Sequence, residues 1–211
     1  TGADVTYAMC RVDGTAYDLE AAVVAAVEPP TPANGQYWID TSAAVHVLRQ
    51  YSTTTSLWTA IPTVYVKIGY AEIGTNFAQY DGITLSGCAG PVDNVALAAQ
   101  ITALNTSNVI QAVGTDYIVI TGIIDQAYTQ ATGAVTVART SPAIDYVTEC
   151  DNRLWGCKYG IVDGEAVNEI YACALGDFKN WNRYMGISTD SYAVSVGTDG
   201  KFTGAITFLG Y

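Results

Sequence analysis

The side chain most often used as a general base near neutral pH is histidine, and this chain has only one, His46. A Ser-His-Asp or Cys-His catalytic site would have to include His46, and no nucleophile motif such as G-x-S-x-G accompanies it. His46 lies in the run Val45-His-Val-Leu-Arg-Gln-Tyr51, where alternation with Val45 and Val47 predicts a strand with the histidine facing solvent. The sequence therefore predicts a surface histidine rather than a catalytic one.

Paired carboxylates are the other common route to hydrolysis, in particular of glycosidic bonds. The acids that lie near aromatic residues are Glu149, Asp151, Glu165, Glu169 and Asp177. Glu149 and Asp151, two residues apart, would share one face of a strand, where they would repel each other without a defined partner. We expect no catalytic residue and predict that the protein is not an enzyme, with glycan cleavage kept as a third hypothesis.

Metal and cofactor sites also lack a recognisable pattern. The five cysteines form no CxxC pair and no metal-binding spacing with histidine (Cys10, Cys88, Cys150, Cys157 and Cys173). We expect Cys150, Cys157 and Cys173, in strand-like runs, to be buried thiols of a chain that matures in a reducing cytosol, with disulfides between neighbouring strands left open. Asp177, Asn180 and Asn182 could ligate calcium, but the D-x-D-x-D-G order is missing and capping of their own turns explains them better. No metal and no cofactor is predicted.

Aromatic residues in the first third of the chain could instead contact a ligand or a partner. The likeliest platform for stacking on a sugar ring consists of Tyr37, Trp38, Tyr51 and Trp58. Aromatic residues on strands more often belong to the core or to cross-strand pairs. Both interpretations stay open at the level of sequence.

The overall composition narrows the function classes. Of 211 residues, 50% are hydrophobic and only 14% charged, and the abundance of Tyr, Gly, Thr, Val and Ile favours strands joined by turns. The formal net charge of −11, without any cluster of Lys and Arg, argues against specific binding to nucleic acid and to anionic membranes. No apolar run is long enough for membrane insertion.

The sequence patterns divide the chain into three segments, 1–68, 69–140 and 141–211. We predict a mainly β protein of several small antiparallel domains with at most one or two short helices. Asp13-Gly14 predicts a hairpin turn, 21–27 is ambiguous between helix and strand, and 93–104 predicts a helix capped by Asp93. The last strand-like run, 201–211, ends with the chain, which itself begins at Thr1. We therefore expect this chain to be part of a longer polypeptide.

Two stretches carry a resemblance to bacteriophage structural proteins. Asn34-Gly-Gln-Tyr-Trp-Ile-Asp-Thr-Ser42, followed by Leu48, Tyr51 and Trp58, resembles the G-x-x-W-x-D-T-S … L-x-x-Y … W module of phage tail and fibre proteins. The C-terminal matches are similar to propeller blades of phage tail-nozzle or tail-stabilisation proteins, although Phe178 and Lys179 stand where that pattern often has a proline (Asp151-Asn-Arg-Leu-Trp-Gly-Cys157, Asn168-Glu-Ile-Tyr-Ala-Cys-Ala-Leu-Gly-Asp177, Asn180-Trp-Asn182 and Asp190-Ser-Tyr-Ala-Val194).

The resemblance implies a non-enzymatic virion component of the tail, nozzle or head-to-tail connector, assembled in the bacterial cytoplasm. Its partners would be copies of itself, other virion proteins and the remainder of a longer polypeptide, and 141–211 would supply one or two propeller blades. The alternative function is a host-recognition module that binds surface glycan through Tyr37, Trp38, Tyr51 and Trp58.

Overall fold

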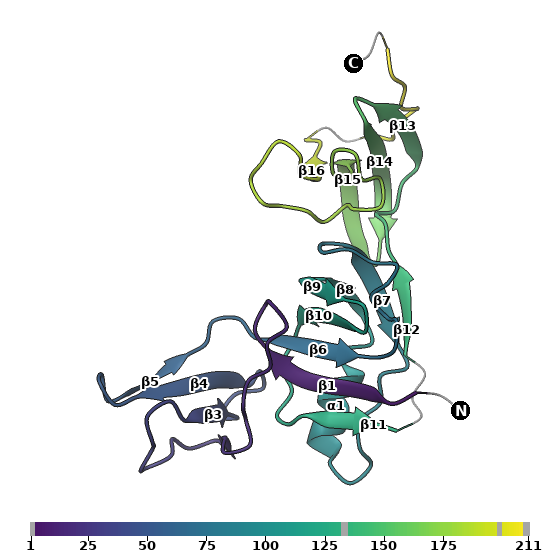
Figure 1. The fold of residues 1–211 in the computed structure, drawn as a ribbon. Coiled ribbons are helices and arrows are strands. Elements are labelled where there is room, and N and C mark those ends of the chain that lie inside the picture. The colour runs from purple at the N-terminus through teal and green to yellow at the C-terminus, as the bar shows by residue number, and fades with distance from the viewer. Residues whose placement is uncertain (1–2, 132–134, 198–199, 209–211) are drawn as a thin grey trace. The chain divides into compact units, whose positions relative to one another are not determined.

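A computed structural model describes residues 3–131, 135–197 and 200–208 of the chain (Figure 1). The fold is mainly β: the described residues form sixteen strands in four small sheets and one short helix, α1. The chain divides into two compact units, 1–79 with 84–137 and 80–83 with 138–211. Each unit is described by itself.

The core of the first unit is a five-stranded antiparallel sheet with the strand order β11-β1-β6-β10-β9 (β1 Val5–Cys10, β6 Tyr65–Gly69, β9 Ala112–Gly114, β10 Tyr117–Thr121 and β11 Tyr128–Gln130). Tyr7 and Met9 of β1 lie opposite Ile68 and Val66 of β6, which in turn lie opposite Ile118 and Ile120 of β10. All six side chains are buried. Alternation along three neighbouring strands therefore places one apolar face against the core.

Helix α1, Val95–Thr102, buries Leu97 and Ile101 in this unit. Its N-cap is Asn94, whose side-chain oxygen accepts a hydrogen bond from the backbone amide of Leu97 at 3.1 Å. The predicted cap, Asp93, was therefore wrong by one residue. Asp and Asn cap helices about equally well, so residue type alone could not distinguish the two.

A separate four-stranded sheet in the first unit has the order β2-β3-β4-β5 (β2 Val23–Ala25, β3 Tyr37–Asp40, β4 Val47–Ser52 and β5 Leu57–Ala60). The ambiguous run 21–27 contains the short strand β2, which pairs with β3 in parallel. The run 15–19 after Asp13-Gly14 forms no strand and contributes only an isolated bridge between Cys10 and Ala16. Strand β1 instead takes the distant partners β6 and β11.

The third sheet has the order β12-β7-β8 (β7 Gly82–Ser86, β8 Ser107–Val109 and β12 Thr136–Arg139), and the boundary between the two units falls within β7 and β12. The structure thus places most of the predicted segments 1–68 and 69–140 in one unit, because the five-stranded sheet combines strands from both segments. The predicted boundary at 140 lies close to the start of the main part of the second unit, at residue 138.

The second unit is built on an antiparallel meander of four consecutive strands, β13-β14-β15-β16 (β13 Tyr146–Cys150, β14 Arg153–Val162, β15 Glu165–Ala172 and β16 Tyr192–Ser195). Asp151 and Asn152 connect β13 to β14 with φ angles of +52° and +58°, as in a two-residue type I′ hairpin. No closed barrel or propeller is present in the described part of the chain. Residues 201–208, expected as a strand, have no regular structure, and 209–211 lie outside the described residues.

A buried arginine organises the long loop 173–191 between β15 and β16. The guanidinium of Arg153, a residue only 6% exposed, donates to the backbone carbonyls of Cys173, Ser188 and Asp190. These carbonyls come from both ends of the loop, so one cation joins the two ends. The arginine of the Asn-Arg-Leu-Trp motif is therefore a structural residue.

The carboxylate of Asp190 holds the same loop from within. It accepts hydrogen bonds from the backbone amides of Met185 and Ile187. Burial raises the pKa of Asp190, but these amides and that of Gly186 stabilise the charged form more strongly, so the net pKa lies below its usual range. The loop is thus fixed by backbone hydrogen bonds to two charged side chains.

We expect Arg153→Met to lower the free energy of unfolding of the second unit by roughly 2–5 kcal/mol, because three loop carbonyls lose their donor inside the protein. Chemical denaturation monitored by fluorescence measures the change. Lys179→Met, which removes an exposed cation from the same loop, is the matched control. Equal stability of the two variants would contradict the role of Arg153.

Candidate functional site

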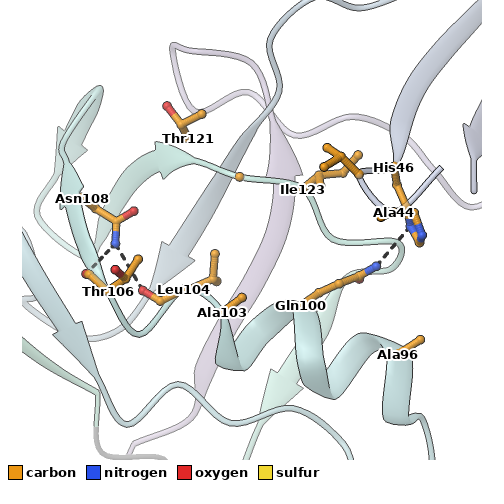
Figure 2. A pocket seen from close by; sticks show the side chains of 12 residues that line it. Ala44, His46, Ala96, Gln100, Ala103, Leu104, Thr106, Asn108, Thr121 and Ile123 are labelled. Carbon is orange, nitrogen blue, oxygen red and sulfur yellow. Dashed lines mark hydrogen bonds between the residues drawn. The ribbon is translucent and has the colours of Figure 1, made fainter.

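His46 lines a cavity of about 480 Å³ in the first unit, together with helix α1 and the segment after β10 (Figure 2). Its Nδ1 lies 2.8 Å from a carboxylate oxygen of Asp125 and 3.3 Å from the side-chain nitrogen of Gln100. The side-chain oxygen of Gln100 accepts a hydrogen bond from the backbone amide of Asp125 at 2.9 Å. The three side chains therefore form one hydrogen-bonded cluster.

The expectation that His46 faces solvent was wrong. Its side chain is only 21% exposed and forms an ion pair with Asp125 when the imidazole is protonated. The strand β4 begins only at Val47, so the alternation counted from Val45 does not apply to the histidine. Its partners come from elements that lie 54 and 79 residues away, a pairing that the local pattern could not indicate.

A carboxylate and the histidine that it orients are two members of a nucleophile-activating triad, and the third member is a hydroxyl or thiol. Figure 2 shows Thr106 and Thr121, the hydroxyl residues of this cavity, at the end away from His46. Within the part of the chain that the structure describes, His46 makes no hydrogen bond to a hydroxyl or thiol. The cluster thus joins the loop before β4 to α1 and to the segment after β10.

Three of the four predicted platform residues lie on one face of the β2–β5 sheet. Trp38 lies opposite Arg49, and Tyr51, two residues further along β4, lies opposite Trp58 of β5. The ring of Trp58 is 5.5 Å from that of Trp38 and 5.3 Å from that of Tyr51, at interplanar angles of 69° and 56°. These are edge-to-face and tilted contacts, the geometry preferred by aromatic pairs within a protein.

Trp38 is a core residue of this sheet, only 6% exposed. Its indole nitrogen donates to the carbonyl of Ala25 at 2.8 Å, and the guanidinium carbon of Arg49 lies 5.5 Å from its ring centre. Arg49 in turn donates to the carboxylate of Asp40 at 2.9 Å. Trp38 and Asp40, two residues of the tail-fibre-like motif, therefore have structural roles within this sheet.

Tyr37 lies apart from the other three residues. It is opposite Gln50 on the other face of the sheet, and its ring contacts that of Tyr17 at 5.6 Å in an edge-to-face arrangement. Only Tyr51 and Trp58 thus combine partial exposure with a shared face. The structure brings together a smaller aromatic surface than the sequence predicted.

The remaining candidates have structural explanations. Asp177 and Asn180 accept hydrogen bonds from the backbone amides of Lys179 and Asn182, two residues further on, which is the turn capping expected of them. All five cysteines are free thiols, and burial raises the pKa of Cys10 to about 11. Among the described residues, no group of three or more His, Cys, Asp and Glu side chains could hold a metal ion.

A surface that the sequence analysis missed lies on the C-terminal sheet. Among the described residues, 13 of the 20 exposed large apolar side chains lie between Tyr146 and Phe208. On the sheet itself, Tyr146, Cys157, Ile170 and Val194 form one row across β13, β14, β15 and β16. The alternation along β14 and β15 could have indicated this surface, but only the strand pairing shows that the rows coincide.

No protein-family model, curated protein or solved structure matches the chain. No helix in the described part of the chain has the length and apolarity needed to span a bilayer.

The stability of the β2–β5 sheet falls at acid pH because the sheet contains the charged carboxylate of Asp40. Hydrogen bonds from Ser42, followed by the pair with Arg49, hold the pKa of Asp40 below its usual value. A carboxyl group with a lowered pKa stabilises the fold above its unfolded pKa of about 3.9, and this stabilisation is lost as the pH falls through the folded pKa. We expect Asp40→Asn to unfold more readily at neutral pH and to lose less stability than wild type below about pH 4.

Thermal unfolding between pH 2 and 7 measures this effect. Glu28→Gln, which changes an exposed acid outside the strands, is the control. Parallel stability curves for wild type and Asp40→Asn below pH 4 would show that the lowered pKa of Asp40 contributes nothing to folding.

Proposed function

We propose that this protein is a non-enzymatic structural component of a bacteriophage virion, in the tail, nozzle or head-to-tail connector, and that it acts by assembly with other protein surfaces. The observation that carries the assembly part is the apolar face of the β13–β16 sheet. Four large apolar side chains of this face, Tyr146, Ile170, Tyr192 and Val194, are exposed, and exposed apolar patches mark interaction sites.

The virion part of the proposal rests on the two resemblances. Their motif residues carry clear structural roles: Arg153 fixes a loop, Trp38 and Asp40 hold the β2–β5 sheet, and Trp155 stacks on Tyr192 with ring centres 6.3 Å apart. The four-stranded meander has the strand number and order of a single propeller blade. In a propeller, each blade packs against its neighbouring blades. A single blade-like sheet therefore suits a structural part of a larger assembly.

The acidic balance also fits this proposal. The first unit contains ten acids and three bases, and each of the three bases, Arg11, Arg49 and Lys67, lies over an aromatic ring of the same unit. Few cations are thus free to bind phosphate. A channel-associated part with this charge would let DNA pass without retaining it.

Mass spectrometry of phage particles purified on a density gradient tests the proposal. We expect peptides of this chain in the particle fraction, at a fixed ratio to the major capsid protein, and immunogold label at the tail or connector. Recovery of the chain only from the particle-free fraction of the same lysate would contradict a structural role in the virion.

A second candidate is binding of host-surface glycan through Tyr51 and Trp58, which are half-exposed on one face of the β2–β5 sheet. For this function we expect Trp58→Ala to abolish signals on an array of bacterial surface glycans while the circular dichroism spectrum is retained. Trp155→Ala, which removes a half-exposed tryptophan of the second unit, is the control. Absence of signal from the wild-type protein would exclude the second candidate.

A further inference from the structure

Strand β13 is an edge strand of the second unit, and part of its backbone faces away from the sheet. Opposite residues of an antiparallel pair alternate between those that exchange hydrogen bonds and those whose backbone groups point away from each other. Leu154, opposite Glu149, points its carbonyl toward β15, where it accepts a hydrogen bond from the backbone amide of Cys173 at 3.0 Å. The backbone groups of Glu149 therefore point the other way, out of the free edge, and so do those of Val147, two residues before it.

The residues of β13 do not themselves block pairing with another chain. Proline or lysine on the strand, or a segment that covers it, are common means by which proteins protect an exposed edge. The sequence of Tyr146–Cys150, Tyr-Val-Thr-Glu-Cys, contains neither proline nor lysine, and Tyr, Val and Thr favour strands. The free edge of β13 is therefore suited to pair with an extended strand unless another segment covers it.

The segment 201–208 reaches this edge through Thr207 (Figure 1). The hydroxyl of Thr207 donates a hydrogen bond to the backbone carbonyl of Glu149, one of the groups that point out of the free edge. A threonine hydroxyl has a single proton, so in the second contact, at 3.0 Å, it accepts a hydrogen bond from the hydroxyl of Thr148. Thr207 thus binds the edge both as a donor and as an acceptor.

The chain around Thr207 is extended, but it does not pair with β13. Burial alternates between neighbouring residues here: Ala205 and Thr207 are half-buried, whereas Ile206 and Phe208 are exposed by 85 and 71%. This period of two is that of an extended chain with one side turned toward the protein. Among the described residues, no backbone hydrogen bond joins 201–208 to β13. Side-chain hydrogen bonds therefore hold the segment at the edge.

We propose that residues 201–208 form a strap that covers the free edge of β13 and keeps it from pairing with an extended strand of another chain, and that Thr207 holds the strap in place. In strand addition, main-chain hydrogen bonds along an exposed edge supply the affinity. The strap occupies the same edge with fewer hydrogen bonds than a paired strand would form, so it competes with strand addition and can be displaced. This inference is independent of the proposed role in a virion.

A peptide added to the full chain tests the strap. The probe is a fluorescein-labelled synthetic peptide with the sequence of residues 201–208, and fluorescence anisotropy measures its affinity for the protein. We expect Thr207→Val, which keeps the shape of the side chain and removes its hydroxyl, to bind the peptide about tenfold more tightly than wild type, because the competing strap has lost its two hydrogen bonds.

Two variants of the same segment are the controls. Thr207→Ser keeps the hydroxyl, and Thr203→Val removes the hydroxyl of an exposed threonine of the strap. Both should bind the peptide as weakly as wild type. Circular dichroism shows that each variant is folded before the peptide is added.

Hydrogen exchange followed by NMR locates the bound peptide. We expect the peptide to protect the backbone amides of Val147 and Glu149, which point out of the free edge. Equal affinity of the peptide for wild type and Thr207→Val, no binding to either protein, or binding that leaves these amides unprotected would overturn the proposal. None of these results bears on whether the chain is found in purified virions, so the two proposals can fail separately.

Discussion

The account depends on one feature of the second unit: large apolar side chains are exposed on one face of the β13–β16 sheet. Ile144 packs over Gly156 on one face, while on the other face Tyr146, Ile170, Tyr192 and Val194 are exposed and Cys157 and Ala172 between them are buried. Uncovered apolar area of this kind costs about 25 cal/mol per Å² relative to its burial. Packing against another protein surface recovers that free energy, and the assembly account follows from this.

The rest of the second unit supports that open face. Arg153 and Asp190 hold the loop 173–191 through its backbone groups, and Trp155 stacks on Tyr192 at an interplanar angle of 4°. The face is therefore presented by strands and a loop that are fixed by hydrogen bonds. A preformed surface loses less conformational entropy on association than a mobile one.

Much of the fold could be predicted from the sequence because it depends on local patterns. The β-rich class, the strands β14, β15 and β16 and the helix near residue 95 follow from alternation, turn residues and capping, whereas the strand expected from residue 201 is not formed by 201–208. The partners of β1 could not be predicted, because Asp13-Gly14 indicated a local hairpin whereas pairing with β6 and β11 depends on residues far along the chain. The placement of His46 failed for the same reason.

For the candidate site too, the residue types could be predicted from the sequence and the spatial arrangement could not. Tyr37, Trp38, Tyr51 and Trp58 were identified as a set by residue type, but the strand register separates Tyr37 from the others and buries Trp38. The apolar face of the β13–β16 sheet was not identified, since it is defined only when the registers of four strands are combined. Residue types therefore predicted the members of a surface, and pairing decided which of them share it.

The central claim is that the sheet face that carries Tyr146, Ile170, Tyr192 and Val194 is covered by protein in the assembled state. Hydroxyl-radical footprinting of the free chain and of the chain in purified phage particles measures this coverage one side chain at a time. We expect Tyr146, Ile170, Tyr192 and Val194 to be less reactive in the particles than in the free chain. Equal reactivity of these side chains in both samples would contradict the account.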